Sequence, residues 1–212
     1  MDFNAACRSL PLHVPDWLER VVAVYAQMDA AYDDAAVHAG FTCTGCEDNC
    51  CRTRFRHHTL IEYAYLRQGV LSLAAGARRR IVADAAVYRE ALREAESRGA
   101  SFRYWCPLNR EGRCRLYAFR PMICRLHGLP HILHHPVRGV IQGTGCHIFE
   151  QAHRQRPLRP LDRSGIYKKL AGLEQAVRLA TRFRAPVRMT VADMILAVDN
   201  DNPAKQMVAG GG

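Results

Sequence analysis

The chain has 212 residues, of which 49% are hydrophobic and 24% charged, and its formal net charge is +10. This length suits one buried core, so we expect a single domain over residues 1–198 and a flexible tail over 199–212. No apolar run reaches the length of a bilayer span, and the first twelve residues have no apolar signal region. We therefore expect a cytoplasmic protein without membrane contact.

The positive charge does not by itself indicate nucleic-acid binding. Arginine accounts for 27 of the 30 basic residues, and these arginines are scattered along the chain. If eight thiolates hold two divalent ions, the net charge falls to roughly +6. We therefore do not expect a nucleic-acid partner. Composition names no protein partner or substrate.

Helical periodicity is the main local signal. Apolar residues recur at three- and four-residue spacing in several segments. Proline suits the first turn of a helix, as at Pro15 and Pro121. A capping-box pattern is formed by Thr59 and Glu62, and Thr190 is a further candidate cap. Glycine closes the first four helices. The expected helices cover residues 15–39, 59–69, 72–97, 121–128, 166–180 and 190–198.

The helical pattern fails between Phe102 and Phe149, apart from the short helix at Pro121. Strands are weakly indicated around 137–142, and 151–165 resembles a linker. The expected fold class is mainly α, a helical domain with a loop-rich cysteine and metal-binding centre and little or no β.

Cysteines are the most informative residues. Four of them fall within nine positions, and four more follow in the region without helical pattern. In a reducing compartment such thiols do not persist as disulfides, and their clustering favours metal ligands. Cys7 stands alone among small apolar residues and is expected in the core. The eight predicted ligands are Cys43, Cys46, Cys50, Cys51, Cys106, Cys114, Cys124 and Cys146.

The spacing of the first four cysteines leaves two alternatives open. A redox dithiol of the thioredoxin type follows a strand and opens a helix, whereas Cys43 and Cys46 follow a predicted helix. Adjacent side chains rarely point into one site. Cys50 and Cys51 are therefore either ligands of two different metal sites, or one of them packs in the core.

Residues around the cysteines suggest how the thiolates are stabilised. Gly45, Gly112 and Gly145 precede cysteines in short loops, where backbone amides can approach sulfur. Arg120 and Arg125 flank Cys124 and are predicted cofactor-binding residues that hold an anion. The stronger alternative is that both arginines brace the cluster loop through hydrogen bonds.

The choice between zinc and iron–sulfur rests on spacing. Structural zinc sites prefer two Cys-x2-Cys pairs, and only one is present. The later cysteines are separated by seven, nine and twenty-one residues, an arrangement that iron–sulfur clusters tolerate. We therefore favour an iron–sulfur cluster over zinc. His127 and His147 are weaker candidates that can replace a cysteine, whereas the pairs His57-His58 and His134-His135 lack chelating spacing.

The ordered motifs resemble the YkgJ-type cysteine-cluster family, the zinc- or iron-chelating domain proteins. The resemblance covers residues 41–147 and implies metal binding by the matched cysteines. A related branch, the flagellin lysine N-methylases, suggests an iron–sulfur cluster and protein methylation, but the chain has no glycine-rich S-adenosylmethionine fingerprint. The motifs that carry the resemblance are Cys-x2-Cys-x3-Cys-Cys, Cys106-Pro-Leu, Gly112-Arg-Cys114-Arg-Leu-Tyr117, Arg120-Pro-Met-Ile-Cys124-Arg125 and Gly145-Cys146.

Three classes of function remain at this stage. The first is a metal-binding protein whose iron–sulfur centre serves a redox, sensing or structural role. The second is an enzyme that modifies a protein side chain, and the third is a zinc-stabilised interaction or RNA-binding module. Because the sequence shows no acid–base pair and no nucleophile with its base, it leaves open whether the protein is an enzyme. We predict that the eight cysteines converge in space, and fewer than four sulfurs in one neighbourhood would contradict metal binding.

Overall fold

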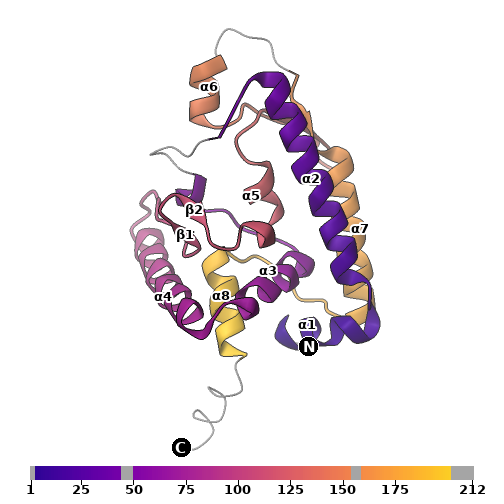
Figure 1. Ribbon diagram of the computed structural model, residues 1–212, viewed down its shortest axis with the longest axis vertical. Coiled ribbons are helices and arrows are strands. Elements are labelled where there is room, and N and C mark those ends of the chain that lie inside the picture. Colours follow the sequence, from indigo (N-terminus) through magenta and orange to yellow (C-terminus); the bar gives the residue numbers. More distant parts are fainter. Residues whose placement is uncertain (1–2, 44–49, 154–158, 202–212) are drawn as a thin grey trace, which may run out of the picture.

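The computed structural model describes residues 3–43, 50–153 and 159–201 (Figure 1). The described part is mainly helical, which confirms the expected fold class at that level. The helices are α1 (Phe3–His13), α2 (Trp17–Ala39), α3 (Leu60–Ser72), α4 (Ala75–Ser97), α5 (Met122–Leu126), α6 (His147–His153), α7 (Ser164–Thr181) and α8 (Val191–Asn200). The strands are β1 (Asn109–Arg110), β2 (Arg113–Cys114), β3 (His131–His135), β4 (Gly139–Gly143) and β5 (Leu161–Asp162).

The helices form two groups that meet at α3. The long helices α2 and α7 lie side by side, and α8 packs against α4 and α3 (Figure 1). Helix α5 packs against α2 and lies between it and the hairpin of β1 and β2. The loops that carry cysteines are therefore held on a helical frame.

Helix α3 is the centre of the main core. Leu60, Ile61, Tyr63 and Leu66 are fully buried, so this helix is apolar on several faces rather than on one. A second, smaller apolar cluster joins the end of α2 to α6. Its buried members are Ala36, Ala39, Leu129 and Phe149.

The end of α3 corrects one prediction. We expected Gly69 to end this helix, but the helix continues to Ser72. A Cβ atom at Gly69 would lie 2.5 Å from Cγ of Phe119. The glycine is therefore explained by the close approach of an aromatic ring. At Gly40 the expected helix stop is confirmed, because this residue adopts the left-handed conformation with φ of 65°.

The buried carboxylate of Glu174 caps the start of α3 from the neighbouring helix α7. Its Oε1 accepts a hydrogen bond from the amide of Leu60 at 2.9 Å, and Oε2 accepts one from Ile61 at 3.0 Å. These amides have no acceptor within their own helix, and the negative charge of a carboxylate at a helix N-terminus interacts favourably with the helix dipole. Thr190 caps α8 as predicted, in a capping box with Asp193.

Two predicted irregular segments are partly structured. The tail was expected from residue 199, but α8 extends to Asn200, and Asp201 forms ion pairs with Arg8 and Arg67. The rest of the predicted tail, 202–212, lies outside the described residues. The linker expected over 151–165 contains the end of α6 and strand β5, and its Arg163 is buried. Ion pairs and backbone pairing therefore override the loop-like composition of both segments.

The β structure is limited to short pairs. Strands β3 and β4 form an antiparallel hairpin, and β5 pairs with β3 in parallel. The weak strand signal at 137–142 overlaps the turn and strand β4 of this hairpin. Within the described ranges, no helix combines the length and hydropathy needed to cross a membrane.

Candidate metal centre

Six of the eight predicted ligands lie around one cavity of about 950 Å³. The cavity is bounded by α2, α5, the 3-10 turn Cys50–Arg52 and the hairpin of β1 and β2. Of the other two candidates, Cys46 lies outside the described residues, and Cys146 does not line this cavity. The cysteines that line it are Cys43, Cys50, Cys51, Cys106, Cys114 and Cys124.

Main-chain hydrogen bonds join the two cysteine-bearing loops. The amide of Cys106 donates to the carbonyl oxygen of Cys51 at 2.8 Å. In the hairpin that follows, Cys114 pairs with Asn109 across the two strands. Gly112, predicted in a short loop before Cys114, has φ of 79°, and its amide donates to Oδ1 of Asn109 at 3.3 Å. The backbone thus fixes the positions of three cysteines relative to one another.

Helix α5 brings Cys124 to the same cavity. It begins directly after Pro121, as predicted, and the amide of Met122 donates to Oε1 of Glu62 at 3.0 Å. The Glu62 side chain is buried, and its Oε2 accepts a hydrogen bond from the hydroxyl of Thr59 at 2.7 Å. Helix α3 therefore anchors the helix that carries Cys124.

Burial keeps three of the cavity thiols protonated near neutral pH. It raises the pKa of Cys106 to about 12 and raises the pKa of both Cys114 and Cys124 above their usual range. Backbone amides of Leu108 and Asn109 lower the pKa of Cys106, and the amide of Leu116 acts likewise on Cys114. Amide donors near sulfur are thus present around Cys106 and Cys114, whereas Gly45 lies outside the described residues.

The side chains of Cys50 and Cys51 are hydrogen-bonded to each other. The thiol of Cys50 hydrogen-bonds to Cys51 and lowers the pKa of Cys51 to about 6, and the same bond raises the pKa of Cys50. The side chain of Asn109 and the charge of Arg120 lower the pKa of Cys51 further. Both cysteines are partly exposed and line the cavity, so neither is a core residue.

A second group of cysteines lies towards Tyr32 and α6. The pKa of Tyr32 is raised by burial and then by Cys43, Cys146 and Cys50, which places these three thiols near its hydroxyl. The amide of Cys146 donates to the carbonyl of Gly128 at 3.0 Å. At Gly145, a Cβ atom would lie 2.8 Å from this same oxygen, so the glycine is needed for the close backbone approach.

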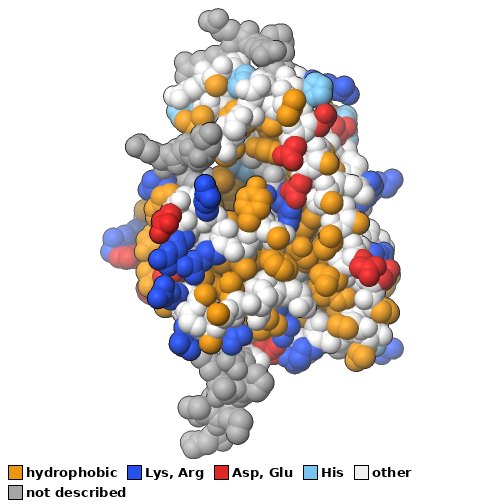
Figure 2. All heavy atoms as spheres, viewed as in Figure 1, with side chains coloured by type: hydrophobic (Ala, Val, Ile, Leu, Met, Phe, Trp, Pro, Cys, Tyr) orange, Lys and Arg blue, Asp and Glu red, His pale blue; other side chains and the backbone are white. Residues whose placement is uncertain are grey.

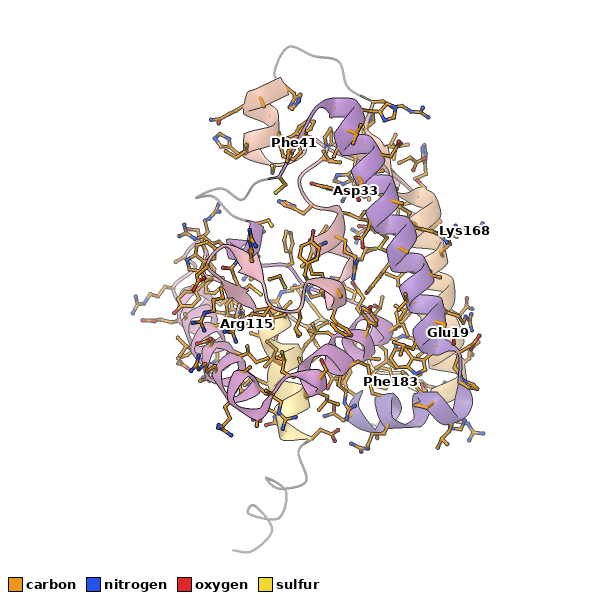
Figure 3. All side chains as sticks on the ribbon, viewed as in Figure 1. Glu19, Asp33, Phe41, Arg115, Lys168 and Phe183 are labelled. Carbon is orange, nitrogen blue, oxygen red and sulfur yellow. The ribbon has the colours of Figure 1, made fainter. Side chains whose placement is uncertain are left out.

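The second group is supported by the smaller apolar cluster. Phe41, labelled in Figure 3 at the end of α2, packs edge-on against Phe149 with ring centroids 5.0 Å apart. Cys146 packs against this cluster, whereas Cys106 and Cys114 pack against the main core. The two groups of cysteines therefore rest on different parts of the protein.

Both predicted cofactor-binding arginines line the cavity and are engaged by the protein. Arg125 is buried, forms an ion pair with Asp29 and donates to the carbonyls of Ala118 and Arg120. Arg120 stacks on Tyr117 and donates to the carbonyl of Cys124 at 3.2 Å. These contacts are the bracing hydrogen bonds considered above.

The cavity is also lined by acidic and basic side chains, and Asp29 is paired there with Arg120 and Arg125. Asp29 and Asp33 come from α2, and Asp33 is labelled in Figure 3. Arg113 and Arg120 come from the hairpin and the loop before α5. Figure 2 shows acidic side chains over α2 and basic side chains over α4 and the hairpin.

Two buried donors near the sulfurs have no hydrogen-bond partner. Nδ2 of Asn109 makes no bond of normal geometry, although it lies close enough to Cys51 to lower its pKa. The hydroxyl of Tyr25 is also unpartnered, and both Glu62 and Cys124 act on its pKa, which burial raises. The Asn109 donor therefore lies beside a sulfur that becomes a strong acceptor once it is a thiolate.

Sequence reasoning missed these donors and set aside His57 because it lacks chelating spacing. His57 is buried in the cavity lining, its Nδ1 lies 3.8 Å from Oε1 of Glu62, and its Nε2 is unpartnered. Hydrogen bonds between its backbone and that of Met189 fix its position. The only sequence signal was its proximity to the capping pattern at Thr59, because His57 has no helical spacing to another ligand.

The two histidine candidates differ in position. His127 lines the cavity and packs against Phe55, and burial followed by the charge of Arg163 lowers its pKa. His147 does not line the cavity, and its Nε2 lies 2.8 Å from Nε2 of the Gln151 side chain. Of these two candidates, His127 therefore lines the cavity with the six cysteines, and His147 does not.

Among residues 3–43, 50–153 and 159–201, no three Cys, His, Asp or Glu side chains are grouped as a metal site requires. None of the family models, curated proteins or solved structures compared with the chain matches it. The resemblance to the cysteine-cluster family therefore stays a prediction.

Proposed function

We propose that the protein binds a metal centre through its clustered cysteines, and that this centre is an iron–sulfur cluster in preference to zinc. Its role is redox, sensing or structural. The observation that carries the proposal is the position of six candidate cysteines, from separate segments of the chain, around one cavity. Core packing alone gives no reason to place so many thiols around an open space.

The electrostatics of the cavity suit a cation. Burial raises the pKa of Cys106, Cys114 and Cys124, so these three thiols are neutral near pH 7 in the absence of a metal. Metal binding replaces these protons with positive charge and removes the cost of burying several thiolates. Arg120 contributes in the same direction, because its charge lowers the pKa of both Cys51 and Cys114.

Thiolate ligands suit both metals chemically, and the preference for iron–sulfur rests on dimensions. A single zinc ion needs four ligands at about 2.0–2.3 Å, whereas six cysteines surround a cavity of about 950 Å³. A cluster of several iron atoms spans a wider set of thiolates than one ion does. When bound, an iron–sulfur centre would supply one-electron transfer, and zinc would supply only charge and cross-linking.

A second candidate is an enzyme that modifies a protein side chain. The cavity extends beyond the cysteines to Tyr88, Val191 and Ala192, so it has room for a ligand beside a metal centre. Asp29 and Asp33 give that space an acidic side. No residue is assigned a catalytic role, and this candidate depends on the same cysteines.

The experiment is anaerobic purification followed by iron, sulfide and zinc analysis and an absorption spectrum. We expect a broad visible absorption with matching iron and sulfide content. A colourless protein with stoichiometric zinc would replace iron–sulfur by zinc, and a protein without metal after reconstitution would overturn the proposal. Cys7→Ala is the matched control, because Cys7 is buried in the main core and does not line the cavity.

A further inference from the structure

We propose that the surface over α4 and the hairpin of β1 and β2 binds an acidic peptide segment of a partner protein, anchored by one large apolar side chain. This inference goes beyond the proposed metal centre and concerns the surface beside it. The anchor site is a groove of about 540 Å³, called the hairpin groove below. Its walls include Asp84 and Val87 of α4, Tyr104 and Trp105 of the loop that follows, and Arg110 and Glu111 of the hairpin.

The hairpin groove presents apolar side chains to solvent. Val87, Tyr104 and Trp105 are 55%, 38% and 45% exposed. Cζ of Arg52 lies 5.6 Å from the ring centroid of Trp105, a cation–π contact that holds this ring in place. Contiguous exposed apolar side chains mark interaction sites, and tryptophan, tyrosine and arginine dominate the binding energy of protein interfaces. The groove therefore offers a preformed seat for an apolar side chain.

Positive charge surrounds the hairpin groove. Residues 50–58 and 98–120 together contain nine arginines and one acidic residue. The main-chain hydrogen bond between Cys106 and Cys51 joins these two segments. Figure 2 shows basic side chains over α4 and the hairpin. Arginines that are scattered along the sequence are thus brought together by the fold.

Much of this charge is not neutralised by acidic side chains of the protein. A single oxygen of Glu96 pairs with both Arg54 and Arg56 at 2.9 Å, so one carboxylate serves two arginines. In the part of the chain that the structure describes, neither Arg113 nor Arg115, which is labelled in Figure 3, forms an ion pair. Surplus positive charge on a surface selects a negatively charged partner.

The cavity thiols do not account for these exposed arginines. The arginines with the largest effects on the pKa of Cys51 and Cys114 are Arg120 and Arg125, which the protein holds through Tyr117 and Asp29. The exposed arginines around the hairpin groove are therefore available to an external anion.

The acidic residues in the groove favour a peptide over a nucleic-acid strand. Asp84 and Glu111 lie in its lining, where they would repel phosphate groups. A peptide brings backbone N–H donors to these carboxylates and can place its own carboxylates beside the surrounding arginines. The groove shares Cys106, Pro107 and Gly112 with the cysteine cavity, so the bound segment would lie against the loops that carry candidate ligands.

The test is fluorescence anisotropy of the full-length protein with a short dye-labelled peptide of Asp, Glu and Gly around one central phenylalanine. One matched peptide carries serine in place of the phenylalanine, and another carries Asn and Gln in place of the acids. We expect saturable binding of the first peptide and at least about 10-fold weaker binding of each matched peptide, because each lacks the anchor or the charge.

Protein variants locate the site. Trp105→Ala and Arg113→Glu should each weaken binding of the first peptide by at least about 10-fold. Leu179→Ala is the control, because Leu179 is exposed on α7, across the molecule from α4 (Figure 1). Wild-type affinity in the Trp105→Ala variant would overturn the proposal.

A second measurement needs no substitution and covers a variant that fails to fold. The chain has two tryptophans, and Trp17 is only 3% exposed, so acrylamide quenching of fluorescence reports mainly on Trp105. We expect the bound peptide to reduce this quenching. Absence of saturable binding, equal affinity for the phenylalanine and serine peptides, or unchanged quenching at saturation would overturn the proposal. Tighter binding of oligouridine with protection of Trp105 would assign the groove to single-stranded nucleic acid and overturn it equally.

Discussion

The amide of Cys106 donates a 2.8 Å hydrogen bond to the carbonyl oxygen of Cys51, although helices α3 and α4 separate the two residues in the chain. This bond brings the loop after α4 back to the first group of cysteines. It fixes main-chain positions without using either sulfur. Both cysteines line the cavity.

The loops around the cavity should depend on metal for part of their order. Residues 105–127 contain four short elements joined by turns, and they surround the candidate ligands. We expect amide hydrogen exchange in this segment to accelerate when a chelator removes the metal, because the ligand cross-links are lost. Exchange in α2 and α7 should change little. Unchanged exchange in 105–127 after complete metal removal would count against a structural contribution of the metal.

Tyr25→Phe and Asn109→Asp should weaken metal binding without unfolding the protein. The first removes an unpartnered hydroxyl near Cys124, and the second places a carboxylate near Cys51. We expect each to lower metal affinity by about 10- to 100-fold, as for other changes around metal ligands. Cobalt titration measures the loss, and Tyr104→Phe, at an exposed tyrosine, is the control for the first variant. Wild-type affinity in both variants would show that these donors do not face the bound thiolates.

Stability should fall in acid partly through Glu62. Burial raises the pKa of this carboxyl, but hydrogen bonds and charge from His57, Thr59 and Met122 outweigh it, so its pKa lies below the usual value. A lowered pKa in the folded state contributes stability above the unfolded pKa of about 4.3, and this contribution is lost as pH falls through the folded value. We expect Glu62→Gln to be less stable at pH 7 and to show a shallower loss in acid.

Urea unfolding of the metal-free proteins between pH 3 and 7 measures this dependence. Glu96→Gln, at a largely exposed carboxylate, is the control for loss of a surface charge. If wild type and Glu62→Gln lose stability in parallel over the whole range, Glu62 is not the group that links folding to protons.

Gly69→Ala should destabilise the protein although alanine is the better helix former. The added methyl group would meet the ring of Phe119 at 2.5 Å. We expect a loss of about 1–3 kcal/mol from overpacking, which exceeds the gain of about 1 kcal/mol in helix propensity. Gly172→Ala in α7 is the control, because its Cβ meets nothing within 4 Å and should stabilise. Denaturant unfolding compares the two, and equal stabilisation would contradict the packing explanation.

The long helices were predictable because their apolar spacing and end signals agree. Gly40 and Thr190 end and begin helices as expected, since each provides a local backbone or capping requirement. Gly69 looked the same in sequence, but a tertiary contact with Phe119 explains it. Helix α1 was missed, and it contains Pro11 near its end, a residue that lowers helical propensity.

The candidate site was predictable as a set of residue types but not as an arrangement. Cysteine spacing identified the thiols, and the placement of six of them around one cavity depends on tertiary folding. Tyr25 looked like one more apolar position on a helix, and Asn109 looked like a turn residue. Only their unpartnered donors distinguish them, because hydrogen bonding depends on neighbours that are distant in sequence.

The most direct test of metal binding through these cysteines is X-ray absorption spectroscopy at the edge of the metal that accompanies the anaerobically purified protein. We predict a first shell dominated by sulfur, with metal–sulfur distances of about 2.3 Å. An iron–sulfur centre would add scattering from neighbouring iron atoms beyond this first shell. A first shell of only nitrogen and oxygen would contradict the account, because it would show that the clustered cysteines do not hold the metal.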